Sequence, residues 1–253
     1  TRASRTPSCP ASKQRLKAFF EFIEKCQIDY YCFHDFDIAP DSLLAAMQDT
    51  AFVASLGTDT QHLFGYFLPE TYQVFWTPDP KPVIRRLKTE FDRFFTDAMK
   101  AQAEQRGLTV DEVVTLASIV EWEARKEEEK RRIAGVYLNR LRIGMALQAD
   151  PTVQYALMQM DGGRMRRLTF ADYEVQHPYN TYKYPGLPPG PITNPAPSTI
   201  RAVLEPEDHD FLYFVADGTG GHRFSRTLTE HNRAADAYRR LMRERRREQA
   251  EEQ

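Results

Sequence analysis

Apolar residues recur at spacings of three and four in three successive stretches of the chain, and this periodicity constrains the fold more than any other feature. Such spacing places the apolar side chains on one face of a helix. The stretch Val83–Met99 predicts one long amphipathic helix that Gly107 ends. Two further helices are predicted through Val113–Val120 and Ile133–Leu141, the last stopping near Gly144. Helices with apolar faces predict a mainly helical core.

Local signals predict where other helices begin. Thr109 and Glu112 have the S/T-x-x-E spacing of a capping box. Asp150 followed by Pro151 is typical of an N-cap and a proline at the first helical position. Further helices are predicted over residues 12–27, after Asp41 through Met47, and from about Thr229 into a charged C-terminal tail.

Two segments predict β-structure. Residues 64–76 are aromatic and partly alternating, which favours strands around a turn. Residues 211–216 form a short apolar run, 217–221 carry turn residues, and 222–225 return as a second strand. Together with the helices, this hairpin predicts an α+β fold that is mainly helical with a small antiparallel sheet.

Prolines divide the chain. Seven of the sixteen fall within residues 177–198, interleaved with tyrosines and asparagines. A flexible linker would not need the aromatic rings, so we expect a long ordered loop. Prolines also cluster in the segment 77–82. We place a boundary there, between an N-terminal subdomain of residues 1–78 and a larger domain of residues 79–253.

Composition and charge exclude several classes of protein. Hydrophobic residues make up 42% of the 253 residues, which is enough for a core, and the net charge of −2 indicates neither a nucleic acid nor an anionic lipid partner. No run of about 18 apolar residues is present, so no segment is predicted to span a membrane. The chain begins at Thr1 rather than Met, and we expect an upstream part.

No metal site or cofactor site is predicted. The three cysteines, at positions 9, 26 and 32, are an odd number without C-x-x-C spacing, which fits incidental thiols. The six histidines, His222 and His231 included, lack metal-ligand spacing. The glycines of residues 218–221 do not form a dinucleotide-binding motif.

Glu121 is the candidate for acid–base chemistry. Its helical neighbours Ala117, Ser118 and Ala124 are all small, which leaves room for a ligand beside the carboxyl group. A carboxyl group at the edge of an apolar stripe is partly desolvated, and this helps a general acid to keep its proton. The alternative is a solvated surface glutamate. Glu123 does not share this face and orients a neighbour or faces solvent.

Polar residues set among apolar ones are candidates for sugar binding. Asn139, Gln148 and Asp150 supply donors and acceptors that suit hydroxyl and acetamido groups. Asn180 and Tyr182 lie on the proline-rich loop, where flat rings can stack on sugar faces. The alternatives are local: Asp150 as an N-cap, Asn139 as a helix surface residue, and Tyr182 packed on the core.

Four motifs in one order carry a family resemblance: LASIVEWEA, VYLNRLRIGMALQADPTVQYAL, YNTYKYPGLPPGPITNPAPSTIRAV and FLYFVADGTGGHRFSRTLTEHN. From roughly residue 42 to its end, the chain resembles the MltG (YceG-like) family of endolytic murein transglycosylases. The resemblance implies that Glu121, in the S-I-V-E stretch, is the catalytic residue. It also implies that Gln148, Asn180 and Tyr182 line the substrate groove. Asn139 and Glu123 complete the expected substrate-binding residues.

The resemblance further implies non-hydrolytic cleavage of the bond between N-acetylmuramic acid and N-acetylglucosamine, leaving 1,6-anhydro ends. The implied partners are peptidoglycan glycan strands and the cell-wall synthesis machinery, with no metal, cofactor or nucleic acid. A membrane anchor, absent from this chain, is expected upstream, and the catalytic domain is expected outside the cytoplasm at the plasma membrane. Residues 1–78 are expected to include a partial LysM-like subdomain.

Two alternatives stay open. A muramidase that hydrolyses the same bond would need a second carboxylate about 5–9.5 Å from Glu121, and Asp150 and Glu123 are the candidates. A non-catalytic peptidoglycan-binding protein would keep all of its activities after the substitution Glu121→Gln.

Overall fold

The computed structural model describes residues 40–72, 79–161 and 165–251. In these ranges the elements are α2 (Pro40–Gln48), α3 (Thr50–Ala54), the 3-10 helix η1 (Leu63–Tyr66), α4 (Lys81–Phe94), α5 (Asp97–Gln105), α6 (Val110–Glu123), η2 (Glu127–Glu129), α7 (Lys130–Arg142), α8 (Asp150–Asp161), η3 (Phe170–Glu174), α9 (Pro197–Leu204), β1 (Tyr213–Ala216), β2 (His222–Ser225) and α10 (Leu228–Glu251). The predicted α+β class is confirmed, because helices dominate and the two strands form one antiparallel sheet. The helix predicted over residues 12–27 and the three cysteines lie outside the described residues.

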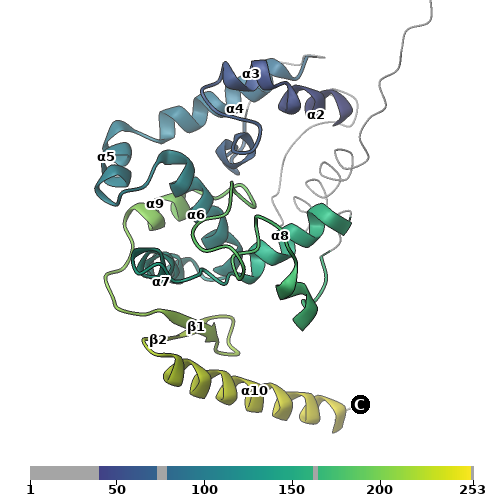
Figure 1. Ribbon diagram of the computed structural model, residues 1–253, viewed down its shortest axis with the longest axis vertical. Coiled ribbons are helices and arrows are strands. Elements are labelled where there is room, and N and C mark those ends of the chain that lie inside the picture. The colour runs from purple at the N-terminus through teal and green to yellow at the C-terminus, as the bar shows by residue number, and fades with distance from the viewer. Residues whose placement is uncertain (1–39, 73–78, 162–164, 252–253) are drawn as a thin grey trace, which may run out of the picture.

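The elements follow one another along an elongated molecule (Figure 1). Helices α2, α3 and α4 lie at one end, α6 to α9 occupy the middle, and the hairpin with α10 lies at the other end. In the described ranges, no helix combines the length and the apolar character that a bilayer crossing needs.

Helix α6 is the centre of the main core. Its residues from Val113 to Val120 are all buried, so apolar contact surrounds the helix on every side. The predicted capping box begins it: Thr109 accepts the backbone N–H of Glu112, whose carboxylate accepts the N–H of Thr109. Helices α7 and α9 pack against α6 and against each other. The helices predicted around Val113–Val120 and Ile133–Leu141 are therefore confirmed.

The long helix predicted from Val83 to Gly107 is wrong in one respect, because it is two helices. Helix α4 ends at Phe94, and the Thr96 side chain accepts the N–H of Met99 to cap α5. A threonine N-cap satisfies a free helix N–H and turns the chain. Apolar spacing continues through the break, which is why periodicity alone did not reveal it. Gly107, with φ of 69°, terminates α5 as predicted.

The strand predicted within residues 64–76 is also wrong where the structure describes it. Residues 63–66 form the 3-10 helix η1, residues 67–72 are irregular, and residues 73–76 lie outside the described ranges. Alternation predicts one buried face, yet the four successive residues Gly65, Tyr66, Phe67 and Leu68 are all buried. Tyr66 and Leu68 join the main core, whereas Phe67 joins a second cluster.

That second cluster joins residues from both sides of the predicted boundary near residue 78. Phe52, Leu63 and Phe67 pack with Val83 and Ile84 of α4. The division into residues 1–78 and 79–253 stays a prediction.

The predicted hairpin is confirmed, with Tyr213 opposite Ser225 and Ala216 opposite His222. Asp217 accepts backbone N–H groups from Thr219 and Gly221 and so closes the turn. Helix α10 packs along the sheet (Figure 1).

Candidate functional site

Glu121 lies in the last turn of α6 with its side chain 27% exposed. One carboxylate oxygen, Oε2, accepts the backbone N–H of Ala196 at 3.0 Å and the hydroxyl of Thr199. The other, Oε1, lies 3.4 Å from the ammonium of Lys130. All three partners donate, so this carboxylate is held in one orientation from two sides while part of it stays open to solvent.

The small residues beside Glu121 were predicted to leave room for a ligand, and this interpretation is wrong for Ser118. The chain's own loop occupies that face. Ser118 Oγ accepts the backbone N–H of Ile192 at 2.9 Å and donates to Thr115 O at 2.7 Å. A small side chain on the helix lets the loop backbone come close enough to bond. The same approach brings Ala196 to Glu121.

Lys130 begins α7 and is buried, with 8% of its side chain exposed. Its Nζ lies 2.6 Å from Glu127 Oε2 and 3.3 Å from Ser198 Oγ, in addition to the contact with Glu121. Burial raises the pKa of Glu127, but hydrogen bonds from Lys130 and Ser198 outweigh it and lower that pKa. A charged Glu127 therefore anchors the ammonium.

Glu123, two residues after Glu121, lies in different surroundings. It is half-buried, and its Oε1 accepts the Tyr137 hydroxyl at 2.9 Å. Burial is the main cause that raises the pKa of Glu123 to about 7, opposed by the Tyr137 hydrogen bond; the Asp150 carboxylate raises the pKa further and Arg140 lowers it. The side chain therefore orients a neighbour, as one sequence interpretation held, and it carries a proton over part of the neutral range.

Asp150 is the first residue of α8, and its carboxylate binds tyrosines. Oδ1 accepts the Tyr182 hydroxyl at 2.6 Å and Oδ2 accepts the Tyr173 hydroxyl at 3.3 Å. The two rings lie 4.7 Å apart. Burial and the Asp150 carboxylate raise the pKa of Tyr182, so its hydroxyl stays a donor. The ring of Tyr182 is only half-buried, so its other side is not wholly packed on the core.

Asn180 lies in the core rather than on an open surface. Its side-chain amide donates to Tyr173 O at 3.0 Å and Val175 O at 2.8 Å, and its Oδ1 accepts the Tyr182 N–H at 3.0 Å. The residue has no exposed surface. Its contacts favour a supporting role for Tyr182; direct substrate binding by Asn180 stays a prediction.

Gln148 is exposed and has an unusual backbone conformation, with φ of 48°. Its N–H donates to Thr181 O at 3.2 Å. A non-glycine residue in the left-handed region costs on the order of 1–3 kcal/mol and is common at functional sites. In the described part of the chain its side-chain amide makes no hydrogen bond, which leaves it available to a ligand.

Asn139 supports the hairpin. Its Nδ2 donates to His209 O at 2.7 Å and Phe211 O at 3.2 Å, which fixes the segment that enters β1. Contact of Asn139 with substrate stays a prediction. His222, on β2, pairs through Nδ1 with Glu129 at 2.8 Å. Among the described residues, no group of three or more His, Cys, Asp or Glu side chains could hold a metal ion.

The sequence prediction missed the partners of Glu121. Lys130, Ala196 and Thr199 lie 9, 75 and 78 residues away from it along the chain. The only local signal is the Pro-Ser-Thr start of α9, a common way for a helix to begin. Of the predicted residues, Glu121 lies against the start of α9, whereas Tyr182 bonds to Asp150 and the Asp150 carboxylate acts on Glu123.

Most of this chain is similar to known proteins. The model of the YceG-like family matches residues 12–237, beginning earlier than the resemblance of the motifs predicted. An endolytic murein transglycosylase of Bacillus subtilis (strain 168) is 38% identical over 178 residues, which are 70% of this chain and 48% of that protein. The chain therefore spans about half the length of this curated relative.

A solved structure is similar in fold. The crystal structure of a YceG-like protein from Listeria monocytogenes matches with a TM-score of 0.67 at 36% identity, over 77% of this chain and 66% of that chain. A shorter similarity, 60% identity over 30 residues, links 12% of this chain to 7% of the xylose isomerase of Staphylococcus xylosus. A match of that length shows neither a shared fold nor a shared activity.

Proposed function

Because this chain belongs to the YceG-like family, we propose that it is an endolytic lytic transglycosylase that cuts peptidoglycan glycan strands with Glu121 as its catalytic acid and base. The observation that carries the proposal is the Glu121 carboxylate, partly exposed at the end of α6 and oriented by Ala196, Thr199 and Lys130. The relative from Bacillus subtilis is an endolytic murein transglycosylase by name.

The proposed reaction needs one carboxyl group. Protonated Glu121 gives its proton to the glycosidic oxygen between N-acetylmuramic acid and N-acetylglucosamine, and the bond from the anomeric carbon to that oxygen breaks. The muramoyl 6-hydroxyl then attacks the anomeric carbon and returns a proton to the Glu121 carboxylate. A 1,6-anhydro ring forms, no water is consumed, and the enzyme regains its starting protonation state.

The test is mass spectrometry of products released from purified peptidoglycan. We expect the wild-type chain to produce anhydro-muramoyl ends, and Glu121→Gln to lower the rate by at least roughly 10²–10⁴-fold, as for other general acid–base groups. Glutamine keeps an acceptor for the N–H of Ala196, so the fold should survive. Glu128→Gln, at an exposed position in η2, is the matched control and should keep wild-type rates.

Other outcomes would replace the proposal. Products heavier by one water would make the chain a muramidase, and Glu123 and Asp150 would then be the carboxylates to substitute next. Cleavage that persists in Glu121→Gln at the wild-type rate would remove Glu121 from the mechanism. Binding of peptidoglycan without any cleavage by a folded wild-type chain would favour a binding protein.

We further propose Gln148 and Tyr182 as direct contacts to the glycan, since the amide of one is exposed and the ring of the other is half-buried. Asn139, Asn180 and Glu123 are kept as substrate-binding candidates that act through the segments they hold. The expected LysM-like part of residues 1–78, the cell-wall synthesis machinery as a partner, and an outer position at the plasma membrane belong to the proposal as well. The family membership supports them.

A further inference from the structure

The ammonium of Lys130 is shared between two carboxylates of different character. Glu127 is the nearer, with 2.6 Å between Nζ and Oε2, and 63% of its side chain is exposed. Glu121 is the farther, with 3.4 Å between Nζ and Oε1. Lys130 itself is buried, and Ser198 Oγ at 3.3 Å completes its contacts.

We propose that Lys130 is a positioning residue for the reaction of Glu121: its ammonium holds the carboxylate in place and stabilises it after the proton has passed to the leaving oxygen. This inference rests on the proposed function. It concerns the ionised half of the catalytic cycle, when a negative charge develops on Glu121 in a partly buried position. A fixed cation there acts without reorganisation during the reaction.

A purely structural role accounts poorly for this placement. Burial of a lysine is costly unless its charge is compensated, and the ion pair with Glu127 at 2.6 Å already provides that compensation. The second approach, to Glu121 at 3.4 Å, is therefore not needed to keep Lys130 buried. Lysines also extend readily to solvent along their flexible stems. Lys130 instead turns inward, toward the end of α6 and the start of α9, where Glu121 lies.

Few charged groups lie around Glu121, so the effect of the Lys130 charge on Glu121 can be measured separately from the effects of other charges. Helix α9 supplies only neutral donors, the Ala196 N–H before it and the hydroxyl of Thr199. Element η2 supplies Glu127, and α7 supplies Lys130. In the described ranges, no other charged side chain forms a hydrogen bond or ion pair with Glu121 or Lys130.

The experiment compares Lys130→Met, Lys130→Arg and Glu127→Gln with the wild-type chain. Lys126→Met is the matched control, four residues earlier and without a contact to Glu121 in the described structure. Turnover number, KM and the pH dependence of kcat/KM are measured on peptidoglycan. In parallel, the ¹³C signal of the Glu121 carboxyl group, assigned with Glu121→Gln, is titrated by NMR.

We expect Lys130→Met to lower kcat about 10- to 100-fold with little change in KM, as for the loss of one hydrogen bond to a charged group. In that variant the carboxylate loses the cation that lies 3.4 Å from its Oε1, so we expect the alkaline limb of the pH profile to move to higher pH. Glu127→Gln frees the ammonium for Glu121 and moves that limb to lower pH. Lys130→Arg keeps the charge and should recover most of the kcat that Lys130→Met loses. Lys126→Met should stay near the wild type.

Equal kcat and an unmoved alkaline limb in Lys130→Met would overturn the inference. If Lys130→Met does not fold, an unmoved alkaline limb in Glu127→Gln would overturn the inference instead. The NMR titration separates the two proposals, because it needs no turnover. A wild-type chain without cleavage rejects the proposed function, whereas a Glu121 signal that titrates identically with and without the Lys130 charge rejects this inference.

Discussion

At the scale of residues, two glutamates two positions apart have opposite surroundings. Three donors surround Glu121, from Ala196, Thr199 and Lys130. Among the described residues, Glu123 accepts one hydroxyl, from Tyr137, and the Asp150 carboxylate acts on Glu123 as a like charge. Because successive helical residues point in different directions, neighbours in sequence can meet different parts of the fold.

Glu123 makes the stability of the protein depend on pH in a predictable direction. Burial raises its pKa to about 7, from 4.5. The native state therefore binds this proton more tightly than the unfolded state, and the resulting stability is present below about pH 4.5 and lost as the pH rises through 7. Glu123→Gln cannot ionise, so we expect it to exceed the wild type by about 1–3 kcal/mol in free energy of unfolding at pH 8 and to match it near pH 4.5.

Urea unfolding of both proteins at several pH values measures this difference. Glu128→Gln, at an exposed position, should show no such trend. A constant offset between wild type and Glu123→Gln across the pH range would mean that Glu123 is not protonated preferentially in the folded protein.

At the scale of elements, the proline-rich loop is a fixed part of the core. Thr181 Oγ1 lies 2.8 Å from Thr152 Oγ1 and accepts the N–H of Ala149 at 3.0 Å, which joins the loop to the start of α8. Asn180 joins the same loop to the segment of Tyr173 and Val175. Side chains that replace the missing ladder or helix bonds let a loop of this length remain ordered.

Asn180→Ala tests whether this amide supports the loop or binds substrate. The substitution removes the side-chain partners of two carbonyl groups and one N–H group that are partly buried, so we expect a loss of about 1–3 kcal/mol in free energy of unfolding together with weaker activity. Thermal unfolding and peptidoglycan cleavage are measured on the same samples. Gln176→Ala, an exposed position on the same segment, should stay within about 0.5 kcal/mol. A raised KM with unchanged stability would instead indicate direct contact between Asn180 and the glycan.

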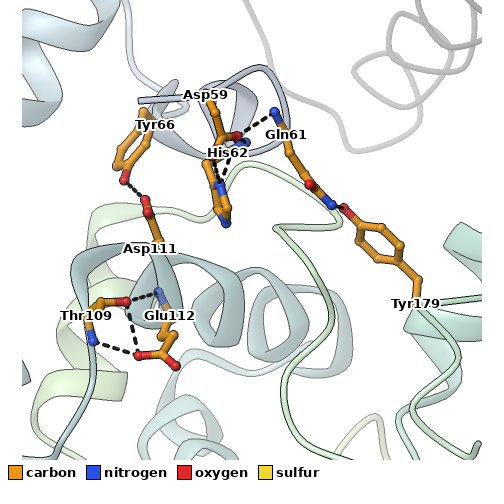
Figure 2. Close-up of polar contacts among 8 residues, drawn as sticks. All are labelled: Asp59, Gln61, His62, Tyr66, Thr109, Asp111, Glu112 and Tyr179. Carbon is orange, nitrogen blue, oxygen red and sulfur yellow. Dashed lines mark hydrogen bonds and ion pairs between the residues drawn. The ribbon is translucent and has the colours of Figure 1, made fainter. Parts of the chain in front are cut away.

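At the scale of the whole molecule, the segment before α4 is joined to α6 and to the proline-rich loop (Figure 2). The Tyr66 hydroxyl donates to Asp111 in the first turn of α6, and Gln61 Nε2 donates to the Tyr179 hydroxyl at 3.3 Å. Between these contacts, Gly65 packs directly on Pro191 and Val114. Because Pro191 neighbours the Ile192 bonded to α6, this junction also confines the loop that reaches Glu121.

Gly65→Ala should therefore act on the junction. A Cβ at position 65 would lie 2.6 Å from Pro191 Cγ and 2.7 Å from Val114 Cγ1, closer than atoms tolerate. Overpacking of this kind costs about 1–3 kcal/mol, and we expect that loss in urea unfolding. Ala51→Ser, at an exposed position in α3, is the control and should change stability by less than about 0.5 kcal/mol. If Gly65→Ala is as stable as the wild type, Pro191 and Val114 can move to accept the added Cβ, and the junction does not hold the segment in place.

Short-range patterns in the sequence were sufficient to predict several local elements of this protein. Apolar spacing and capping residues predicted α6 and α7, and turn residues predicted the hairpin, because these signals act within a few positions of the chain. Where two signals compete, apolar periodicity conceals a helix boundary: Thr96 caps a new helix, α5, inside an unbroken apolar pattern. The small neighbours of Glu121 made it a candidate but left a solvated surface glutamate as an alternative, and the family resemblance of the motif favoured the catalytic interpretation.

The surroundings of Glu121 come from residues that are distant in the sequence and meet in the folded chain. The N–H of Ala196 and the hydroxyl of Thr199 reach it from a loop and a helix start that have no periodicity of their own. Their positions follow from long-range bonds such as Ser118 to Ile192, which no local window of sequence contains. The charge on Lys130 faces inward for the same reason: a side chain takes the direction that its packed neighbours allow, and those neighbours come from α6, η2 and α9.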